Sequence, residues 1–283
     1  MKFSHIALGF SIALARFLYK QDKDITTTYH THESLRVPEA FDGYKIIQIS
    51  DFHNAWFGFR SSKLIREIRK IDGDVIFVTG DVIDRRTPNF KRSMGLISQL
   101  VDILPTYYVT GNHEAHYRGF DRLERAIDAS GMKNISRSNE RLNAGNDHIR
   151  LVGMEDLWFY GTDGDHQVVD DFKEDLEHRL ENRPDRFTIV LSHRPELFDV
   201  YTSFPIDIVF TGHAHGGQIR LPVVKGLYAP HQGVLPKYTE GVHKENDTSM
   251  VVSRGLGNSR FPFRVFNRPE IIVMELKRQQ GVQ

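Results

Sequence analysis

Five short apolar runs in this chain are followed at once by residues of the kinds that bind metal ions in proteins. The runs cover residues 46–50, 75–79, 106–110, 187–192 and 207–211. Each has the length and apolar character of a buried strand. In an open α/β sheet, ligands bind in the crevice beyond the carboxyl ends of the strands. We therefore expect the side chains at the ends of these runs to meet in one site.

The side chains at these ends offer carboxylate, amide and imidazole groups but no sulfur. The candidate ligands are Asp51, His53, Asp81, Asn112, His193, His213 and His215. Groups of this kind suit Mn, Fe, Zn, Co or Ni. Seven are too many for one catalytic ion with an open position, and they suit two ions about 3.5–4 Å apart that share a carboxylate. A single aspartate or asparagine after a strand is more often a cap or turn residue, so the prediction depends on all five positions together.

Composition limits the class of protein. The chain has 283 residues, and its 37 Lys and Arg balance its 37 Asp and Glu. This zero net charge does not favour the basic groove of a nuclease, so no nucleic-acid partner is expected. The sequence contains no cysteine, which excludes disulfides, thiolate metal sites and cysteine nucleophiles. It also lacks a glycine-rich phosphate loop, which excludes a P-loop nucleotide site.

Strand-like runs alternate with helical patterns through most of the chain. Helices are predicted at 61–71, 91–103, 120–129 and 169–181, and further strands at 149–152, 218–221, 250–253 and 271–276. The alternation is typical of βαβ units, whereas the last three strands are predicted to be antiparallel. Residues 222–246 are rich in Pro and Gly and are predicted to form an irregular rim over the site. The chain is thus divided into an N-terminal apolar segment (1–20), a linker or edge strand (21–42), one main domain (43–276) and a tail (277–283).

The N-terminal segment has three interpretations. Its apolar run, residues 6–15, is about half of the ~20 residues that a membrane-spanning helix needs. The run fits a signal-type segment, with a small-x-small cleavage pattern at Ala13-Leu14-Ala15. It also fits an uncleaved helix that lies on a membrane surface, or a helix packed against the body. Membrane association or export is the favoured prediction, with the side of the membrane open and a cytoplasmic location as the alternative.

The motifs at the strand ends resemble those of a known superfamily. The series Asp51-x-His53, Gly80-Asp81-x-x-Asp84, Gly111-Asn112-His113-Glu114, His193 and Gly212-His213-Ala214-His215 is similar to the calcineurin-like metallophosphoesterases, with all blocks in the same order. The apolar N-terminus, the extension of the last block to Gly216-Gly217-Gln218 and the segment Ser253-Arg254-Gly255-Leu256-Gly257 resemble more narrowly the YkuE/YaeI-type bacterial phosphodiesterases.

This resemblance implies both a fold and roles for individual residues. The implied fold of the main domain is a four-layer αββα sandwich of two mixed sheets flanked by helices. The resemblance implies that Asp51, His53 and His215 bind one ion, that Asn112, His193 and His213 bind the other, and that Asp81 bridges them. It also implies an Asp84–His113 pair beside the leaving group. Arg85 matches a phosphate-contacting arginine, although Arg86 stands here in place of the glycine that follows it in the protein-phosphatase branch.

The expected function is that of a dinuclear metal-dependent hydrolase. It would cleave phosphoesters, preferably phosphodiesters or pyrophosphates, by in-line attack of a hydroxide that the ions activate, with His113 assisting the leaving group. Manganese is the favoured metal. If the chain is membrane-bound, the candidate substrates are lipid-linked or cell-wall-linked phosphoesters, namely lipid-linked nucleotides, glycerophosphodiesters or wall polymers. Residues that could shape a pocket for such substrates are Arg194, Tyr228, His231, Lys237 and Arg254. A protein or small-molecule phosphomonoesterase with the same core is one alternative. A non-catalytic, metal-stabilised surface protein is the other.

Overall fold

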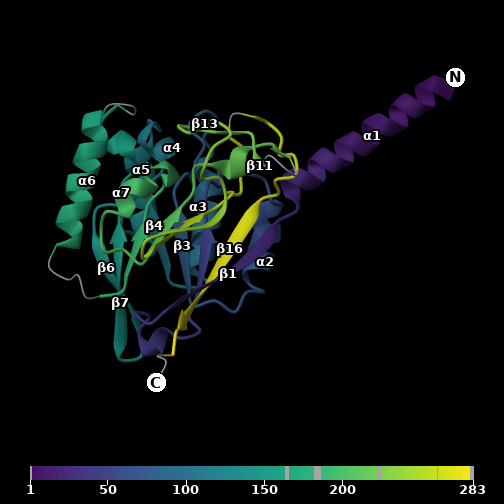
Figure 1. Cartoon of the computed structure of the whole chain (residues 1–283). Helices are drawn as coiled ribbons and strands as arrows, with labels where there is room; N and C mark the ends of the chain where they lie inside the picture. Colours follow the sequence, from purple (N-terminus) through teal and green to yellow (C-terminus); the bar gives the residue numbers. More distant parts are fainter. Residues whose placement is uncertain (1, 163–165, 182–185, 222–224, 260, 281–283) are drawn as a thin grey trace.

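The computed structural model describes residues 2–162, 166–181, 186–221, 225–259 and 261–280. Two six-stranded sheets stack face to face, and helices cover their outer faces (Figure 1). The four-layer αββα sandwich predicted for the main domain is confirmed. A long N-terminal helix, α1 (Lys2–Lys23), projects away from this body.

The first sheet has the strand order β1-β16-β2-β3-β4-β5. Its strands are β1 (Thr26–Ser34), β16 (Glu270–Arg278), β2 (Lys45–Ile49), β3 (Val75–Thr79), β4 (Thr106–Val109) and β5 (Lys133–Asn134). Strands β2 to β5 run parallel, because each crossover carries a helix that packs on the sheet's outer face. These helices are α2 (Ser62–Ile68), α3 (Phe90–Val101) and α5 (Phe120–Ala129), and the short α4 (Asn112–Ala115) follows β4 directly.

The second sheet has the strand order β14-β15-β9-β8-β7-β6. Its strands are β14 (Gly241–Glu245), β15 (Thr248–Val252), β9 (Ile208–Thr211), β8 (Thr188–Leu191), β7 (Asp147–Gly153) and β6 (Asn139–Ala144). Helices α6 (His166–Leu180) and α7 (Phe198–Tyr201) pack on its outer face. Two short hairpins pair β10 (Arg220–Leu221) with β11 (Lys225–Gly226) and β12 (Tyr228–Ala229) with β13 (Gly233–Val234). Residues 222–246, which are predicted to be irregular, therefore contain β11, β12, β13 and β14, whereas β10 lies in the predicted strand 218–221.

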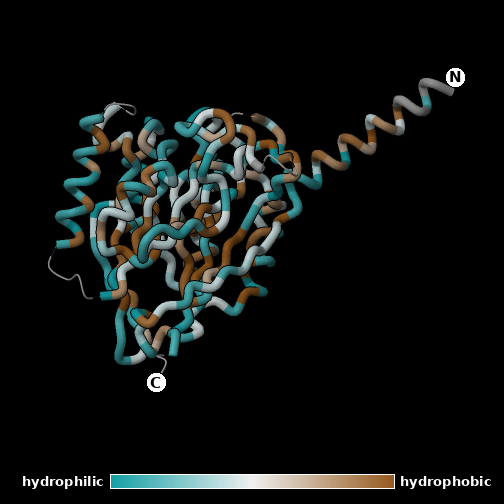
Figure 2. Tube along the Cα trace, viewed as in Figure 1, coloured by the Kyte–Doolittle hydropathy of each residue, from teal (hydrophilic) through white to brown (hydrophobic). Residues whose placement is uncertain are grey.

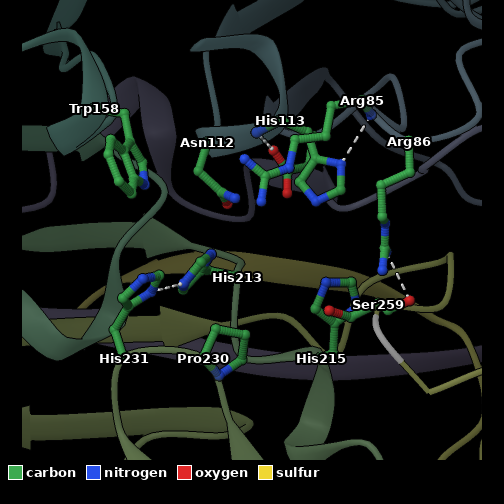
Figure 3. A pocket seen from close by; sticks show the side chains of 11 residues that line it. Arg85, Arg86, Asn112, His113, Trp158, His213, His215, Pro230, His231 and Ser259 are labelled. Atoms are coloured by element: carbon green, nitrogen blue, oxygen red, sulfur yellow. Dashed lines mark hydrogen bonds between the residues drawn. The ribbon is translucent and has the colours of Figure 1, made fainter. Parts of the chain in front are cut away.

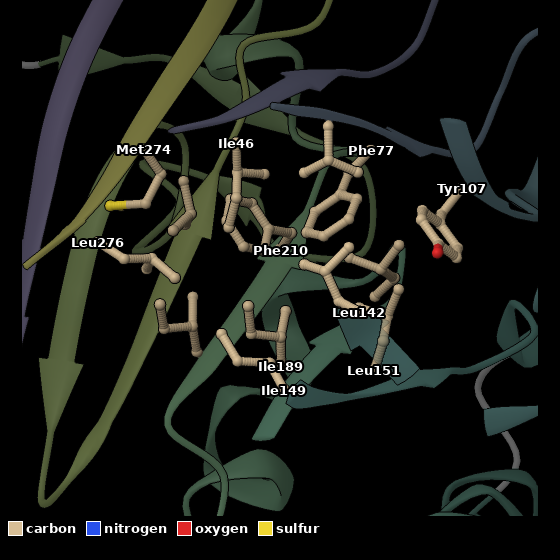
Figure 4. Packing of buried hydrophobic residues seen from close by; sticks show 14 of the residues in the cluster. Ile46, Phe77, Tyr107, Leu142, Ile149, Leu151, Ile189, Phe210, Met274 and Leu276 are labelled. Atoms are coloured by element: carbon tan, nitrogen blue, oxygen red, sulfur yellow. The ribbon is translucent and has the colours of Figure 1, made fainter. Parts of the chain in front are cut away.

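Strict alternation of side chains explains how the strands serve two cores. In β2, Ile46 points into the core between the sheets, whereas Ile47 and Ile49 point to the helices outside. Figure 4 shows the central core, where Phe77 of the first sheet meets Phe210 of the second with ring centroids 5.3 Å apart. These strands are therefore mostly apolar on both faces, and the buried Gln48 of β2 is accommodated because its side chain donates to Thr79 and to the carbonyl of Thr211.

The structure corrects the predicted pairing of the later strands. β15 is antiparallel to β14 but parallel to β9, and β16 is antiparallel to β2 but parallel to β1. Of the two alternatives for residues 21–42, the structure places an edge strand, β1, at Thr26–Ser34. Strand β16 runs to Arg278, two residues into the predicted tail, and residues 281–283 lie outside the described part of the chain.

One of the three interpretations of the N-terminal segment is a helix packed against the body. Most of helix α1 is not packed in this way. Its side chains are largely exposed from Leu8 to Arg16, for example Phe10 at 70% and Ile12 at 60%, and Figure 2 shows this apolar stretch clear of the domain. Its last turns are attached: Phe17 contacts Phe266 with ring centroids 5.5 Å apart, and the Asp22 carboxylate accepts the backbone N–H of Arg264. Within the described residues, no helix is long and apolar enough to cross a membrane.

Candidate metal centre

The seven candidate ligands converge at the carboxyl ends of the central strands of both sheets. The first group combines Asp51 and His53, which follow β2, with Asp81, which follows β3, and His215, which follows β9. The Nε2 atoms of His53 and His215 are 3.2 Å apart. The Oδ1 atom of Asp51 lies 3.3 Å from Nε2 of His215.

The second group lies on the other side of Asp81. Nε2 of His193 is 3.2 Å from Nδ1 of His213 and 3.3 Å from Oδ1 of Asn112. The same Asp81 oxygen, Oδ2, is 3.4 Å from Nε2 of His193 and 3.4 Å from Nε2 of His53. Asp81 is therefore shared by both groups, which is the position of a bridging carboxylate.

These spacings fit ligands that share an ion. Two nitrogens bound to one ion at about 2.0–2.1 Å lie about 3.3 Å apart in a tetrahedral arrangement. The observed separations of 3.2 Å match this spacing. The His/Asp cluster thus fits a dinuclear divalent metal site.

Hydrogen bonds outside the cluster set the tautomers of three histidines. Nδ1 of His193 donates to the carbonyl of Thr79 at 2.7 Å, and Nδ1 of His215 donates to that of Gly257 at 3.3 Å. In both rings this leaves the lone pair of Nε2 facing the cluster. His213 is reversed, because its Nε2 contacts Nδ1 of His231 at 2.8 Å, which leaves Nδ1 for the cluster.

The carboxylates of the cluster are buried, and their negative charge is therefore stable only beside a positive charge. Asp51 and Asp81 are 0% and 1% exposed, and buried carboxylates are costly unless they are paired or bind metals. Burial by itself would lower the pKa of His193, but the carboxylates of Asp81 and Asp51 raise it to about 10. The negative field that attracts this proton is the field that would hold a divalent ion. Burial lowers the pKa of His215 to about 3, which keeps that imidazole neutral as a ligand must be.

The backbone of the site is strained where the ligands lie. Five of the seven candidate ligands adopt left-handed φ angles: Asp51 (51°), His53 (45°), Asp81 (55°), His213 (65°) and His215 (48°). For residues with a Cβ, such conformations cost about 1–3 kcal/mol each and persist where the surrounding structure imposes them, typically at functional sites. The chain thus turns sharply after these strands, and the turns direct the side chains of the candidate ligands into the same cluster.

Two glycines allow the strand ends to approach each other. A Cβ on Gly80 would lie 2.6 Å from Nδ1 of His193, and one on Gly212 would lie 2.5 Å from Oδ2 of Asp51. Gly80 also has a φ of 87°, which side chains rarely adopt. These glycines precede the ligands Asp81 and His213, so the Gly-Asp and Gly-His pairs of the sequence reflect close packing.

Asp84 and His113 lie close together, and a backbone N–H group contacts the same ring nitrogen of His113 as the Asp84 carboxylate does. Oδ1 of Asp84 lies 3.4 Å from Nδ1 of His113, while the backbone N–H of Arg85 donates to the same Nδ1 at 3.1 Å. Burial would raise the pKa of Asp84, but its hydrogen bonds to His113 and to the Arg86 backbone lower it below its usual range, so this carboxylate is ionised. His53, Asp84 and His113 also form a third group with metal-ligand spacing.

A pocket of about 140 Å³ opens over the cluster. Figure 3 shows Arg85, Arg86 and His113 on one wall and His213, His215 and His231 on the other. Arg85 lines the pocket, and its role as a phosphate-contacting residue stays a prediction. Arg86 spans the rim, because its Nη2 donates to the carbonyl of Ser259 at 2.8 Å. Asp81, Asn112, Trp158, Pro230 and Ser259 complete the lining.

Two buried charged residues, Arg194 and Glu114, support the loops that carry the candidate ligands. The side chain of Arg194 is 0% exposed and forms a bidentate pair with Asp156, at 2.5 Å and 2.9 Å. Its Nη1 also donates to Nδ1 of His231 at 2.8 Å, beneath His213. Glu114 accepts the backbone N–H groups of Asp81, Gly111 and Ile83, and so fixes the two loops that carry ligands. Of the two pocket candidates named here, His231 lines the metal pocket, whereas Arg194 is buried and is not among its lining residues. Glu114 stands out in the sequence only as the last residue of the Gly111-Asn112-His113-Glu114 motif.

The other three candidates for shaping the pocket, Tyr228, Lys237 and Arg254, lie outside the metal pocket. Tyr228 lines a neighbouring groove, and Lys237 and Arg254 line a separate cavity beside Glu240. Arg254 instead pairs with Glu270, its Nη2 lying 2.8 Å from Oε1.

The sequence and the fold both match known proteins. The profile of the calcineurin-like phosphoesterase family matches residues 44–217. The chain is 31% identical to the uncharacterized metallophosphoesterase YkuE of Bacillus subtilis, over 96% of this chain and 92% of that protein. It is 26% identical to the phosphodiesterase YaeI of Escherichia coli, over 82% of each.

Among solved structures, the Thermus thermophilus protein TT1561 shares the fold. The TM-score is 0.51 at 14% identity, covering 75% of this chain and 90% of that one. The profile match spans all seven candidate ligands, and the predicted similarity to YkuE and YaeI is confirmed. The chain belongs to the calcineurin-like phosphoesterase family.

Proposed function

We propose that this protein is a dinuclear metal-dependent phosphodiesterase. The observation that supports the proposal most is the shared Oδ2 of Asp81, which lies 3.4 Å from a histidine of each group. When bound, two divalent ions lower the pKa of a water molecule and neutralise charge on a phosphoryl group. Asp51, His53, Asp81 and His215 would hold one ion, and Asp81, Asn112, His193 and His213 the other.

The remaining pocket residues bind and orient the ester. The guanidinium groups of Arg85 and Arg86 line the pocket and attract the phosphate oxygens. Nδ1 of His113 faces the Asp84 carboxylate at 3.4 Å, so its Nε2 is the nitrogen that would donate a proton to the leaving oxygen. The preference for diesters is supported by the similarity to YaeI, which is named as a phosphodiesterase.

Metal removal tests this proposal. We expect the metal-stripped protein to be inactive towards methyl p-nitrophenyl phosphate and to regain activity with Mn²⁺, the favoured metal, because the buried carboxylates cannot activate water alone. The measurement is p-nitrophenolate release during titration with Mn²⁺, Zn²⁺, Co²⁺, Fe²⁺ and Ni²⁺, beside the monoester p-nitrophenyl phosphate. Faster turnover of the monoester would indicate a phosphomonoesterase. Two bound ions without hydrolysis of either ester would favour a non-catalytic, metal-stabilised protein.

We also propose that α1 attaches the protein to a membrane surface. Leu8, Phe10, Ile12 and Leu14 are exposed on the projecting part of the helix, and Arg16, Lys20 and Lys23 follow. An amphiphilic helix of this kind binds by burying apolar side chains among the headgroups while basic residues attract anionic lipid.

Vesicle binding tests this attachment. The full chain should cosediment with vesicles that contain anionic phospholipid. Phe10→Asp/Leu14→Asp should weaken binding by about tenfold or more, since each buried apolar side chain contributes about 1.5–3 kcal/mol. Leu35→Asp/Phe59→Asp, which changes two exposed apolar side chains outside α1, is the matched control. Equal loss in both double variants would contradict a specific role of α1.

A further inference from the structure

A second, apolar cavity adjoins the metal pocket. This groove has a volume of about 130 Å³ and is lined mostly by apolar and aromatic residues, namely Ile219, Leu227, Tyr228 and Phe261, together with Gly217, Gln218 and Ser259. Ser259 lines both the groove and the metal pocket, so the two cavities share a wall. A molecule that reaches from one to the other would place an apolar part beside a phosphate site.

The groove is surrounded by exposed apolar side chains on paired segments. Tyr228 pairs with Val234 in a hairpin, and the backbone N–H of Leu235 donates to the carbonyl of Leu227. Val234 and Leu235 are 76% and 60% exposed. Clustered apolar side chains that remain in water mark interaction sites on soluble domains.

The rim of the groove is also connected to α1. Phe261 and Phe263 contact each other with ring centroids 6.1 Å apart, and Phe266 of the same segment contacts Phe17 of α1. Asn258, one residue before the shared Ser259, donates to the Asp22 carboxylate of α1 at 3.1 Å. The helix with the exposed apolar side chains, α1, is therefore in direct contact with the segment that forms one wall of the groove.

We propose that this groove binds the hydrocarbon chain of a lipid phosphoester whose phosphate lies at the metal cluster. The proposal rests on the proposed phosphodiesterase function and specifies its substrate class. The charges favour such an amphiphile, because Arg85 and Arg86 face the phosphate position whereas the groove walls offer aliphatic and aromatic side chains. A nucleobase in the same place would find few partners for its polar edge, because Gln218, Tyr228 and Ser259 are the lining residues with polar side-chain groups, and a buried polar edge that is incompletely paired is costly.

A series of substrates tests the groove with the metal-loaded, full-length protein. Methyl, butyl and octyl p-nitrophenyl phosphates share the reacting group and differ only in the length of the alkyl arm. We expect kcat/KM to rise by up to about threefold for each methylene that enters the groove, so that the octyl ester exceeds the methyl ester by at least about tenfold. Equal kcat/KM values for all three esters would overturn the proposal. Preference for the adenosine 5′-(p-nitrophenyl) ester over the octyl ester would overturn it too.

Variants of the groove test whether the preference for the octyl ester arises there. Phe261→Ser and Ile219→Ser should each lower the octyl-to-methyl ratio by about threefold or more, with the methyl ester hydrolysed at the wild-type rate within about twofold. Phe59→Ser, which changes an exposed phenylalanine that lines neither cavity, is the control. An octyl preference that survives both groove variants would place the chain elsewhere and overturn the proposal.

Binding separates the groove from the chemistry. Calorimetry with octylphosphonate and methylphosphonate on the metal-loaded protein measures the same preference without turnover. Tighter binding of octylphosphonate that is lost in Phe261→Ser supports the groove even where no ester is hydrolysed, a result that would count against the phosphodiesterase function alone. Equal affinities for the two phosphonates would overturn the groove proposal, whatever the activity.

Discussion

Replacing Asp81 with asparagine is expected to lower kcat/KM for methyl p-nitrophenyl phosphate by about 10³-fold or more. The side chain keeps its shape, and its Oδ1 can still accept the His113 backbone N–H that Asp81 accepts at 2.7 Å. The shared Oδ2 becomes an amide nitrogen, which cannot bridge two cations. A pair of ions contributes several kcal/mol to stabilising a phosphoryl transition state, and about 4 kcal/mol corresponds to about 10³-fold in rate.

Metal content and thermal stability separate this loss from unfolding. A ligand that binds only the folded state stabilises it by about 2.7 kcal/mol at 100 times its Kd. Mn²⁺ should therefore raise the Tm of the wild type and raise that of Asp81→Asn much less. The variant should be folded both with and without Mn²⁺. Asp102→Asn, at the exposed C-terminal end of α3, is the control. Two tightly bound ions and near-normal turnover in Asp81→Asn would exclude Asp81 as the bridging ligand.

The ends of the central strands can be predicted from the sequence because local patterns determine them. The runs before Asp51, Asp81 and His213 are mostly apolar, and this pattern is typical of a strand buried on both faces. Parallel strands then bring their carboxyl ends to one edge, so residues far apart in the sequence meet without any further information. The family resemblance adds the division into two groups, which the spacings around Asp81 match.

Other features depend on contacts that no local pattern specifies. Strand β1 pairs with β16, although more than 240 residues separate the paired positions in the sequence. The hydroxyl of Thr28 also donates to Oε1 of Glu270 between these strands. The Arg194–Asp156 pair joins the end of β8 to the loop after β7, and His231 reaches His213 from a segment without a regular pattern. The groove beside the site likewise forms only when Ile219, Leu227 and Phe261 are packed together.

The second large effect is expected at His113, and its size should depend on the leaving group. Among the described residues that line the pocket, His113 is the imidazole on the wall of Arg85 and Arg86. General acid catalysis contributes about 10²–10⁴-fold, and it matters most when the departing oxygen is strongly basic. His113→Ala should therefore lower kcat/KM for methyl phenyl phosphate by at least about 10²-fold. For methyl p-nitrophenyl phosphate, whose leaving group departs without a proton, the loss should be less than about tenfold.

Metal content distinguishes an acid from a ligand, because His113 also has metal-ligand spacing to His53 and Asp84. If His113 is the acid, His113→Ala keeps two ions and loses activity selectively against the poorer leaving group. His178→Ala, an exposed histidine on α6 that is paired with Glu181, controls for the loss of an imidazole. Loss of an ion together with equal losses for both esters would instead assign His113 to the metal site, and the proton for the leaving oxygen would then have to come from another group in the pocket.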